Sequence, residues 1–158
     1  MRYIDQPESS LCRECNGRCC KGMPGAMSPI DVHPLTKGRI VEMLLSGQYA
    51  IDYWEGDPRE GEDEMSVAYF IRPAVAGCDK LVDASWGGPC GLFVDGTGCS
   101  LSYEDRPQAC RSLQADEDGH CRCEHNIKQQ IAIDWLPYND MIDACIKTVR
   151  EIKERNEQ

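Results

Sequence analysis

The sequence is poor in the large apolar side chains from which most protein cores are built. It has two Phe and three Trp in 158 residues, and aromatic residues make up 7% of the chain. Hydrophobic residues reach 41% only when eleven cysteines are included. A chain of this length fits one domain with a moderate core. Because large apolar groups are scarce, we expect cross-links or bound metal to hold part of the fold.

Long apolar runs and an excess of cations are also missing. No stretch approaches the ~20 apolar residues that a membrane-spanning helix needs, and the segment Met1–Pro7 has no run of signal-peptide length. We therefore expect a cytoplasmic protein. Seventeen Lys and Arg against 27 Asp and Glu give a net charge of −10, which argues against nonspecific binding to nucleic acid or to an anionic membrane.

What the sequence has instead is cysteine. Four of the eleven lie in the nine residues Cys12–Cys20, a density that no packing pattern requires. Two thiols separated by two residues, as Cys12 and Cys15 are, can bind one metal ion. The adjacent Cys19 and Cys20 are expected to point apart. The segment therefore favours either a cluster of several metal atoms or two sites that share one loop.

Local charge and the cysteine count favour metal over disulfides. From Cys12 to Lys21 the segment has three cations and one anion, a local charge of 3 − 1 = +2, and nearby cations favour the thiolate form that binds metal. Structural disulfides are rare in the cytoplasm, and an odd number of cysteines cannot pair completely within one chain. Sulfur-only ligation selects zinc, copper(I) or iron–sulfur centres, and spacing alone does not choose among them.

Hydrophobic periodicity predicts several helices and two hairpins. Apolar residues at helical spacing predict helices at residues 35–46, 125–135 and 139–155. Runs of β-forming residues predict a hairpin, with strands at 49–54 and 66–72. The seven acids in residues 52–64 are expected to form its solvated tip. A shorter hairpin is expected around Asp95-Gly96, and Ser28-Pro29 is a good helix start.

These elements predict a small α+β fold in one cysteine-rich domain that covers residues 1–158. Its motif-bearing part spans about residues 12–113, with irregular metal-binding loops, and C-terminal helices span about residues 124–156. Cys145 lies on the apolar stripe of the last helix, so we interpret it as a core thiol. His33 is interpreted as a polar residue at a helix junction rather than as a ligand.

Motifs in both halves of the chain resemble one known family. Cys12-x2-Cys15-x3-Cys19-Cys20 resembles the opening motif of the CxxCxxxCC (YkgJ-like) family, which is described as putative zinc- or iron-chelating proteins. Its second half is similar to three further segments: Cys90-Gly91-Leu92-Phe93, Gly98-Cys99-Ser100-Leu101 and Arg106-Pro107-Gln108-Ala109-Cys110-Arg111. Relative to that pattern Ser102 is an insertion before Tyr103. The double-cysteine motif combined with R-P-x-x-C-R makes the resemblance specific.

The resemblance implies that thiolates from both regions bind metal. The implied ligands are Cys12, Cys15, Cys19, Cys20, Cys90, Cys99 and Cys110, with Cys78 as an eighth. Eight thiolates would complete two four-thiolate sites, or an iron–sulfur cluster beside a zinc ion. Cys121 and Cys123 could contribute one further ligand. Arg106 and Arg111 either bind loop carbonyls and nearby acids or support the sulfurs.

Three functions remain open. The first is a metal-binding protein whose zinc or iron–sulfur centre is structural or stored. The second is an iron–sulfur-dependent modification enzyme or its metal-carrying part, because similar cysteine domains occur in a flagellin lysine methylase. Against it, the sequence has no Gly-rich nucleotide loop, and its three histidines form no recognisable triad. The third is a thiol or redox sensor, which thiolates beside Arg residues would suit. The sequence identifies no protein partner.

Overall fold

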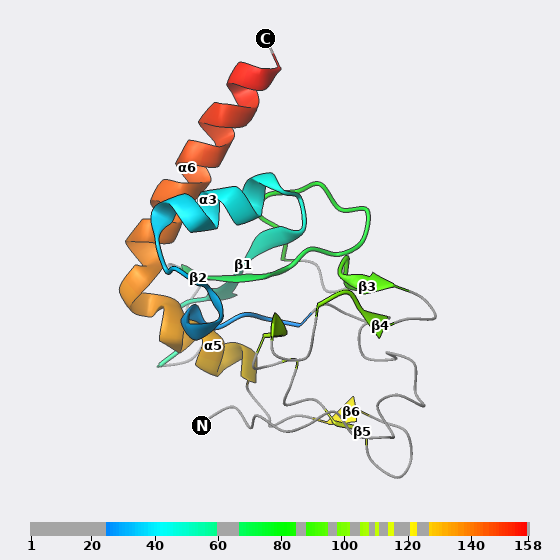
Figure 1. Ribbon diagram of the computed structural model, residues 1–158. Helices are drawn as coiled ribbons and strands as arrows, with labels where there is room; N and C mark the ends of the chain where they lie inside the picture. The colour runs from blue at the N-terminus through cyan, green and yellow to red at the C-terminus, as the bar shows by residue number, and fades with distance from the viewer. Residues whose placement is uncertain are drawn as a thin grey trace.

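The framework of the protein is a two-stranded antiparallel hairpin packed against α-helices (Figure 1). This computed structural model describes residues 25–59, 67–84, 88–94, 98–101, 105–107, 110, 114–115, 121–122 and 127–157. The elements in chain order are η1 (Pro29–Asp31), α3 (Lys37–Leu45), β1 (Tyr49–Glu55), β2 (Val67–Pro73), β3 (Phe93–Val94), β4 (Gly98–Cys99), β5 (Gln114–Ala115), β6 (Cys121–Arg122), α5 (Ile127–Trp135), η3 (Leu136–Tyr138) and α6 (Asn139–Asn156). The predicted α+β class is confirmed.

The predicted hairpins are both present. Strands β1 and β2 pair from Tyr49 opposite Pro73 to Glu55 opposite Val67, within a residue or so of the expected bounds, and residues 60–66 of the acidic tip lie outside the described residues. One acid that was expected in the solvated tip, Asp52, is instead fully buried within β1. The short β3–β4 hairpin turns where Asp95-Gly96 predicted a turn.

The helices bury one apolar core against the hairpin. Helix α5 packs on β1 and β2, and α3 packs against α6. Trp135 at the end of α5 is fully buried, and its indole Nε1 donates a hydrogen bond of 2.8 Å to the carbonyl of Met27. Burying a large apolar side chain contributes roughly 1.5–3 kcal/mol, so Trp135 and Phe70 anchor this core.

Cys145 belongs to that core, as the sequence predicted. Its side chain is fully buried on the face of α6 that meets α3, and its Sγ lies 3.7 Å from the carbonyl of Lys37. His33, by contrast, is exposed beyond η1. Among the described side chains, neither residue belongs to a group of three or more His, Cys, Asp or Glu that could hold a metal ion.

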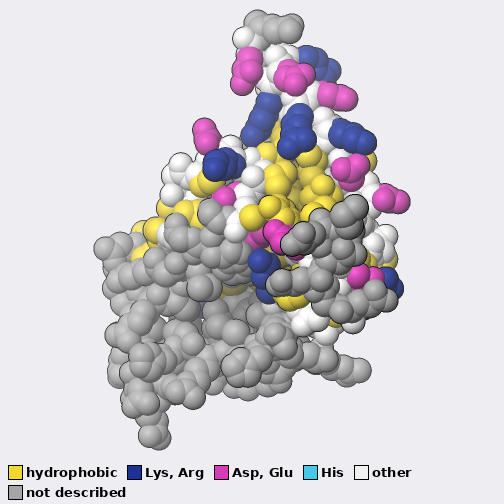
Figure 2. Space-filling model, turned by 180° about the vertical axis from the view of Figure 1, so that it is seen from behind, with side chains coloured by type: hydrophobic (Ala, Val, Ile, Leu, Met, Phe, Trp, Pro, Cys, Tyr) yellow, Lys and Arg dark blue, Asp and Glu magenta, His cyan; other side chains and the backbone are white. Residues whose placement is uncertain are grey.

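The far half of α6 extends beyond the core and carries charges of both signs. Figure 2 shows Lys, Arg, Asp and Glu side chains gathered along this end of the molecule. Lys147 and Asp143, one turn apart, form an exposed ion pair of 3.2 Å. Among the described helices, none combines the length and the apolar character needed to cross a membrane.

Candidate metal centre

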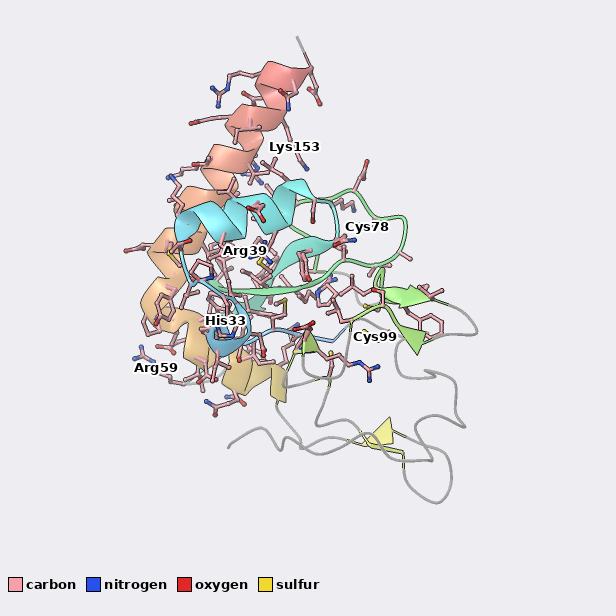
Figure 3. The ribbon with its side chains drawn as sticks, viewed as in Figure 1. His33, Arg39, Arg59, Cys78, Cys99 and Lys153 are labelled. Carbon is pink, nitrogen blue, oxygen red and sulfur yellow. The ribbon has the colours of Figure 1, made fainter. Side chains whose placement is uncertain are left out.

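Half of the predicted ligands fall within the described residues. Cys12, Cys15, Cys19 and Cys20 lie outside them. Cys78, Cys90, Cys99 and Cys110 are described, and none of these four forms a disulfide bond. In Figure 3, Cys78 lies on the loop beyond β2 and Cys99 on β4, on the side of the molecule away from His33 and Arg59.

Cys90 lies on a tight turn that the backbone holds against the end of β2. Gly91 donates a 2.7 Å hydrogen bond to the carbonyl of Ala74, and Cys90 pairs with Val75. A side chain at residue 91 would lie only 3.0 Å from that carbonyl, so Gly91 permits the close approach. The turn therefore gives Cys90 a fixed position, with 6% of its surface exposed.

The pKa of the buried Cys90 thiol is raised above its ordinary value, although some of its neighbours act in the opposite direction. Burial raises the pKa most, and the nearby Cys99 raises it further. The backbone amides of Leu92 and Phe93 donate hydrogen bonds that lower it. Amide donors that face a sulfur stabilise the thiolate form, which is the form that binds metal.

Cys99 and Tyr49 lie near Cys90, and the three residues form one corner of the molecule. In the β3–β4 hairpin, Cys99 stands opposite Phe93, and Phe93 follows Cys90 by three residues. Burial raises the pKa of the Tyr49 hydroxyl, Arg39 lowers it, and Cys90 and Cys99 both raise it. Such mutual electrostatic influence requires that the two thiols and the phenol lie near one another.

Cys78 lies beside a buried ion-pair network. Its Sγ is 3.5 Å from Oδ2 of Asp83. The guanidinium of Arg72, which is fully buried, contacts the same Oδ2 at 3.1 Å and reaches Asp52 Oδ2 at 3.1 Å. This network connects both strands of the hairpin to the loop that carries Cys78.

Cys110 lies against the chain that leads away from the first cysteine motif. A Cβ atom added to Gly25 would overlap the Sγ of Cys110, so this sulfur packs directly on the Gly25 backbone. Gly25 follows Cys20 by five residues. The contact joins segments that are 110 − 25 = 85 residues apart and places Cys110 beside the backbone of Gly25.

Arg106 makes the loop contact that was one of its two expected roles. Its Nε donates a 3.3 Å hydrogen bond to the carbonyl of Leu101. Tyr103, Arg111 and Cys123 lie outside the described residues. Cys121 lies in β6, opposite Ala115 of β5.

The described side chains do not complete a metal site by themselves. Within the described ranges, no three His, Cys, Asp or Glu side chains are grouped so that they could hold a metal ion. The donor chemistry nevertheless fits zinc or iron, because four of the available groups are uncrosslinked thiols.

Comparison with known proteins supports the same chemistry. The family model CxxCxxCC, described as a "putative zinc- or iron-chelating domain", matches residues 11–136. The chain belongs to the CxxCxxCC family. The CxxCxxCC match continues past the expected limit at residue 113 and includes α5. No curated protein matches the chain, and no solved structure does.

Several residues beside the CxxCxxCC cysteines were missed by sequence reasoning. Asp83, Arg72 and Tyr49 were not singled out, and Asp52 was assigned to a solvated loop. The available signal was Arg72 itself, since a cation inside an apolar strand needs a buried partner.

Proposed function

We propose that this protein binds zinc or an iron–sulfur cluster through thiolates drawn from both halves of its cysteine pattern. The proposed ligands are Cys12, Cys15, Cys19, Cys20, Cys78, Cys90, Cys99 and Cys110. The whole chain, residues 1–158, acts as one domain around this centre. Eight thiolates suffice for two four-thiolate sites, or for a cluster with a neighbouring zinc ion.

The contact of Cys110 with Gly25 is the observation that carries the proposal. Five residues of chain reach at most about 18 Å, so the covalent chain keeps the Cα of Cys20 within that distance of the Cα of Gly25. The covalent chain thereby tethers Cys20, the last cysteine of the first motif, near a second-half cysteine, although the two are far apart in the sequence. Shared ligation requires such proximity.

The corner formed by Cys90 and Cys99 provides a second support. Backbone amides face the Cys90 sulfur, and hydrogen bonds of this kind orient metal-bound thiolates and tune the metal. The turn that bears Cys90 is fixed by main-chain bonds to Ala74 and Ala76, just after β2. A preformed half-site of this kind lowers the ordering cost of binding.

The decisive experiment is elemental analysis of protein purified without oxygen, together with acid-labile sulfide content and an absorption spectrum. Iron with sulfide and a broad visible band would identify an iron–sulfur protein. Zinc without colour would identify a zinc protein with a structural or storage role. Protein that retains neither zinc nor iron, with paired cysteines instead, would overturn the proposal.

A further inference from the structure

The outer edge of β1, on the side away from β2, is paired at Ile51. In an antiparallel pair, alternate residues direct their main-chain groups towards the partner strand and away from it. The amide of Ile51 donates to the carbonyl of Leu81 at 2.8 Å, and its carbonyl accepts from the amide of Asp83 at 2.8 Å. By the same alternation, Tyr53 and Glu55 direct their main-chain groups to this outer edge.

The last part of this edge is open. Among the residues that the structure describes, three main-chain groups there have no hydrogen-bond partner: the carbonyl of Tyr53, and the amide and carbonyl of Glu55. The amide of Tyr53 is occupied, because it donates to Asp52 Oδ1 at 2.6 Å. Glu55 is exposed and Tyr53 is half-buried. An unpaired strand edge of this kind is a template for one more strand.

A side chain at the same place also lacks a partner. Trp54 stands between the two edge residues, and its buried indole Nε1 has no hydrogen-bond acceptor within the described part of the chain. A buried donor without an acceptor is unfavourable. A strand added to this edge would place one of its side chains beside Trp54 on the same face of the sheet. An acceptor on that side chain would satisfy the indole.

Charge favours a basic strand as the occupant of this edge. The whole chain has a net charge of −10, and Glu55 places an exposed carboxylate on the edge itself. Side chains of opposite charge on neighbouring strands attract each other, whereas like charges that face each other are destabilising. A second copy of this chain would bring a second Glu55 and a second charge of −10 to the contact, so a basic partner is the better match.

We propose that the outer edge of β1 at Tyr53–Glu55 binds an extended, basic peptide segment of a partner protein, which adds a strand to the hairpin. The amide of Glu55 donates a hydrogen bond to the segment, and the carbonyls of Tyr53 and Glu55 accept from it. A lysine or arginine of the segment pairs with the Glu55 carboxylate. Recognition by strand addition draws its affinity from main-chain hydrogen bonds.

This edge is separate from the proposed metal centre. Tyr49, the β1 residue near Cys90 and Cys99, lies at the opposite end of the strand from Glu55. Six residues of extended chain separate the two ends by about 20 Å. Loss of peptide binding should therefore leave the metal content unchanged, and the two proposals can fail independently.

Two matched pairs of reagents test the role of the main chain. The probe is a short synthetic peptide of alternating lysine and threonine, titrated into the full-length protein by calorimetry. Its control is the same peptide with alternate amides N-methylated, which keeps the charge and loses hydrogen-bond donors. In the protein, Glu55→Pro removes both the amide donor and the carboxylate, whereas Glu55→Gln removes only the charge. Proline is tolerated on edge strands, and circular dichroism verifies folding.

We expect the N-methylated peptide, and the Glu55→Pro protein with the unmodified peptide, to bind about tenfold or more weakly, because each lacks main-chain hydrogen bonds. Glu55→Gln should weaken binding only about threefold and reduce its dependence on salt. Glu151→Gln, which removes an exposed acid from α6, should have no effect. Hydrogen exchange of the Glu55 amide should slow when the peptide is bound.

Three results would overturn the proposal. Absence of binding to the unmodified protein is the first. Equal affinities of the two peptides, or equal losses in Glu55→Pro and Glu55→Gln, would show attraction between charges without strand addition. A dimer of the protein that Glu55→Pro abolishes would assign the edge to a second copy of this chain instead of a basic partner.

Discussion

The sulfur of Cys110 leaves no room for a side chain at residue 25. Its Sγ packs on the Gly25 backbone, where even a methyl group would overlap it. A side chain at residue 25 would force the Cys110 sulfur to move. The constraint comes from this contact and not from an unusual backbone angle, since Gly25 is not among the residues with positive φ.

Gly25→Ala should therefore displace Cys110 and reduce the metal retained per chain. Inserting a methyl group into a filled space typically destabilises a protein by about 1–3 kcal/mol. We expect a loss of stability in that range for this variant. Urea unfolding and elemental analysis measure both effects. Gly38→Ala is the matched control, since nothing lies within 4 Å of the added atom, and this helix position should gain about 0.5–1 kcal/mol. Equal metal content in the two variants would contradict the prediction.

Cys145→Ser should leave the metal content unchanged. Cys145 is fully buried between α3 and α6, and burial raises the pKa of its thiol, so it is expected to remain protonated and inert to alkylation in the folded protein. The serine hydroxyl is more costly to bury, and we expect a loss of about 1–3 kcal/mol in the free energy of unfolding. Cys110→Ser, by comparison, should lower metal content. Metal loss in Cys145→Ser would show that the division between core and ligand thiols is wrong.

Arg72→Met should be among the most destabilising single substitutions in the chain. Removing one partner of a buried ion pair costs about 3–5 kcal/mol, and here two carboxylates each lose their contact with the guanidinium of Arg72. Arg72→Lys keeps the charge but cannot reproduce the paired contacts, so its stability should be intermediate. Arg39→Gln, which breaks an exposed pair with Glu42, should cost about 0–1 kcal/mol. Similar unfolding midpoints for Arg72→Met and Arg39→Gln would refute this account.

The elements of the fold were predictable because their signals are local. The apolar stripe of α6 and the strand residues on either side of the acidic segment are periodic within a few turns or residues. The buried ion pair was not predictable in the same way. Asp52 stands opposite Phe70, two residues from Arg72, so the pair forms only in this register of the hairpin. Register depends on how the tip closes, which composition does not specify.

The same contrast between local signals and long-range contacts holds for the metal centre. The motifs identified the thiols, because cysteine at such spacing has few other uses. They did not indicate which segments meet, since Gly25 and Cys110 come together over 85 residues of loop-rich chain. Asp83 was missed for a related reason, because nothing in the sequence near Cys78 shows that Arg72 will fix this carboxylate.

Asp57 offers a prediction that is independent of metal. The Arg59 side chain donates hydrogen bonds of 3.0 Å and 2.7 Å to the two carboxylate oxygens, and the Arg59 amide donates one of 2.9 Å. These bonds lower the pKa of Asp57 from its ordinary 3.8 to about 2. A carboxyl whose pKa is lower in the folded state stabilises the fold above the unfolded value, and this stability is lost as the pH falls from about 4 to about 2.

Arg59→Gln should return the pKa of Asp57 towards 3.8 and remove this part of the acid sensitivity. The measurement is a carbon-detected NMR titration of the Asp57 carboxyl. Arg150→Gln, which removes an exposed cation from α6, should leave the value near 2. If Asp57 titrates at its ordinary value in the unmodified protein, the paired contact with Arg59 does not persist in solution, and the turn after β1 must be held by other bonds, such as that from Gln129 to the carbonyl of Pro58.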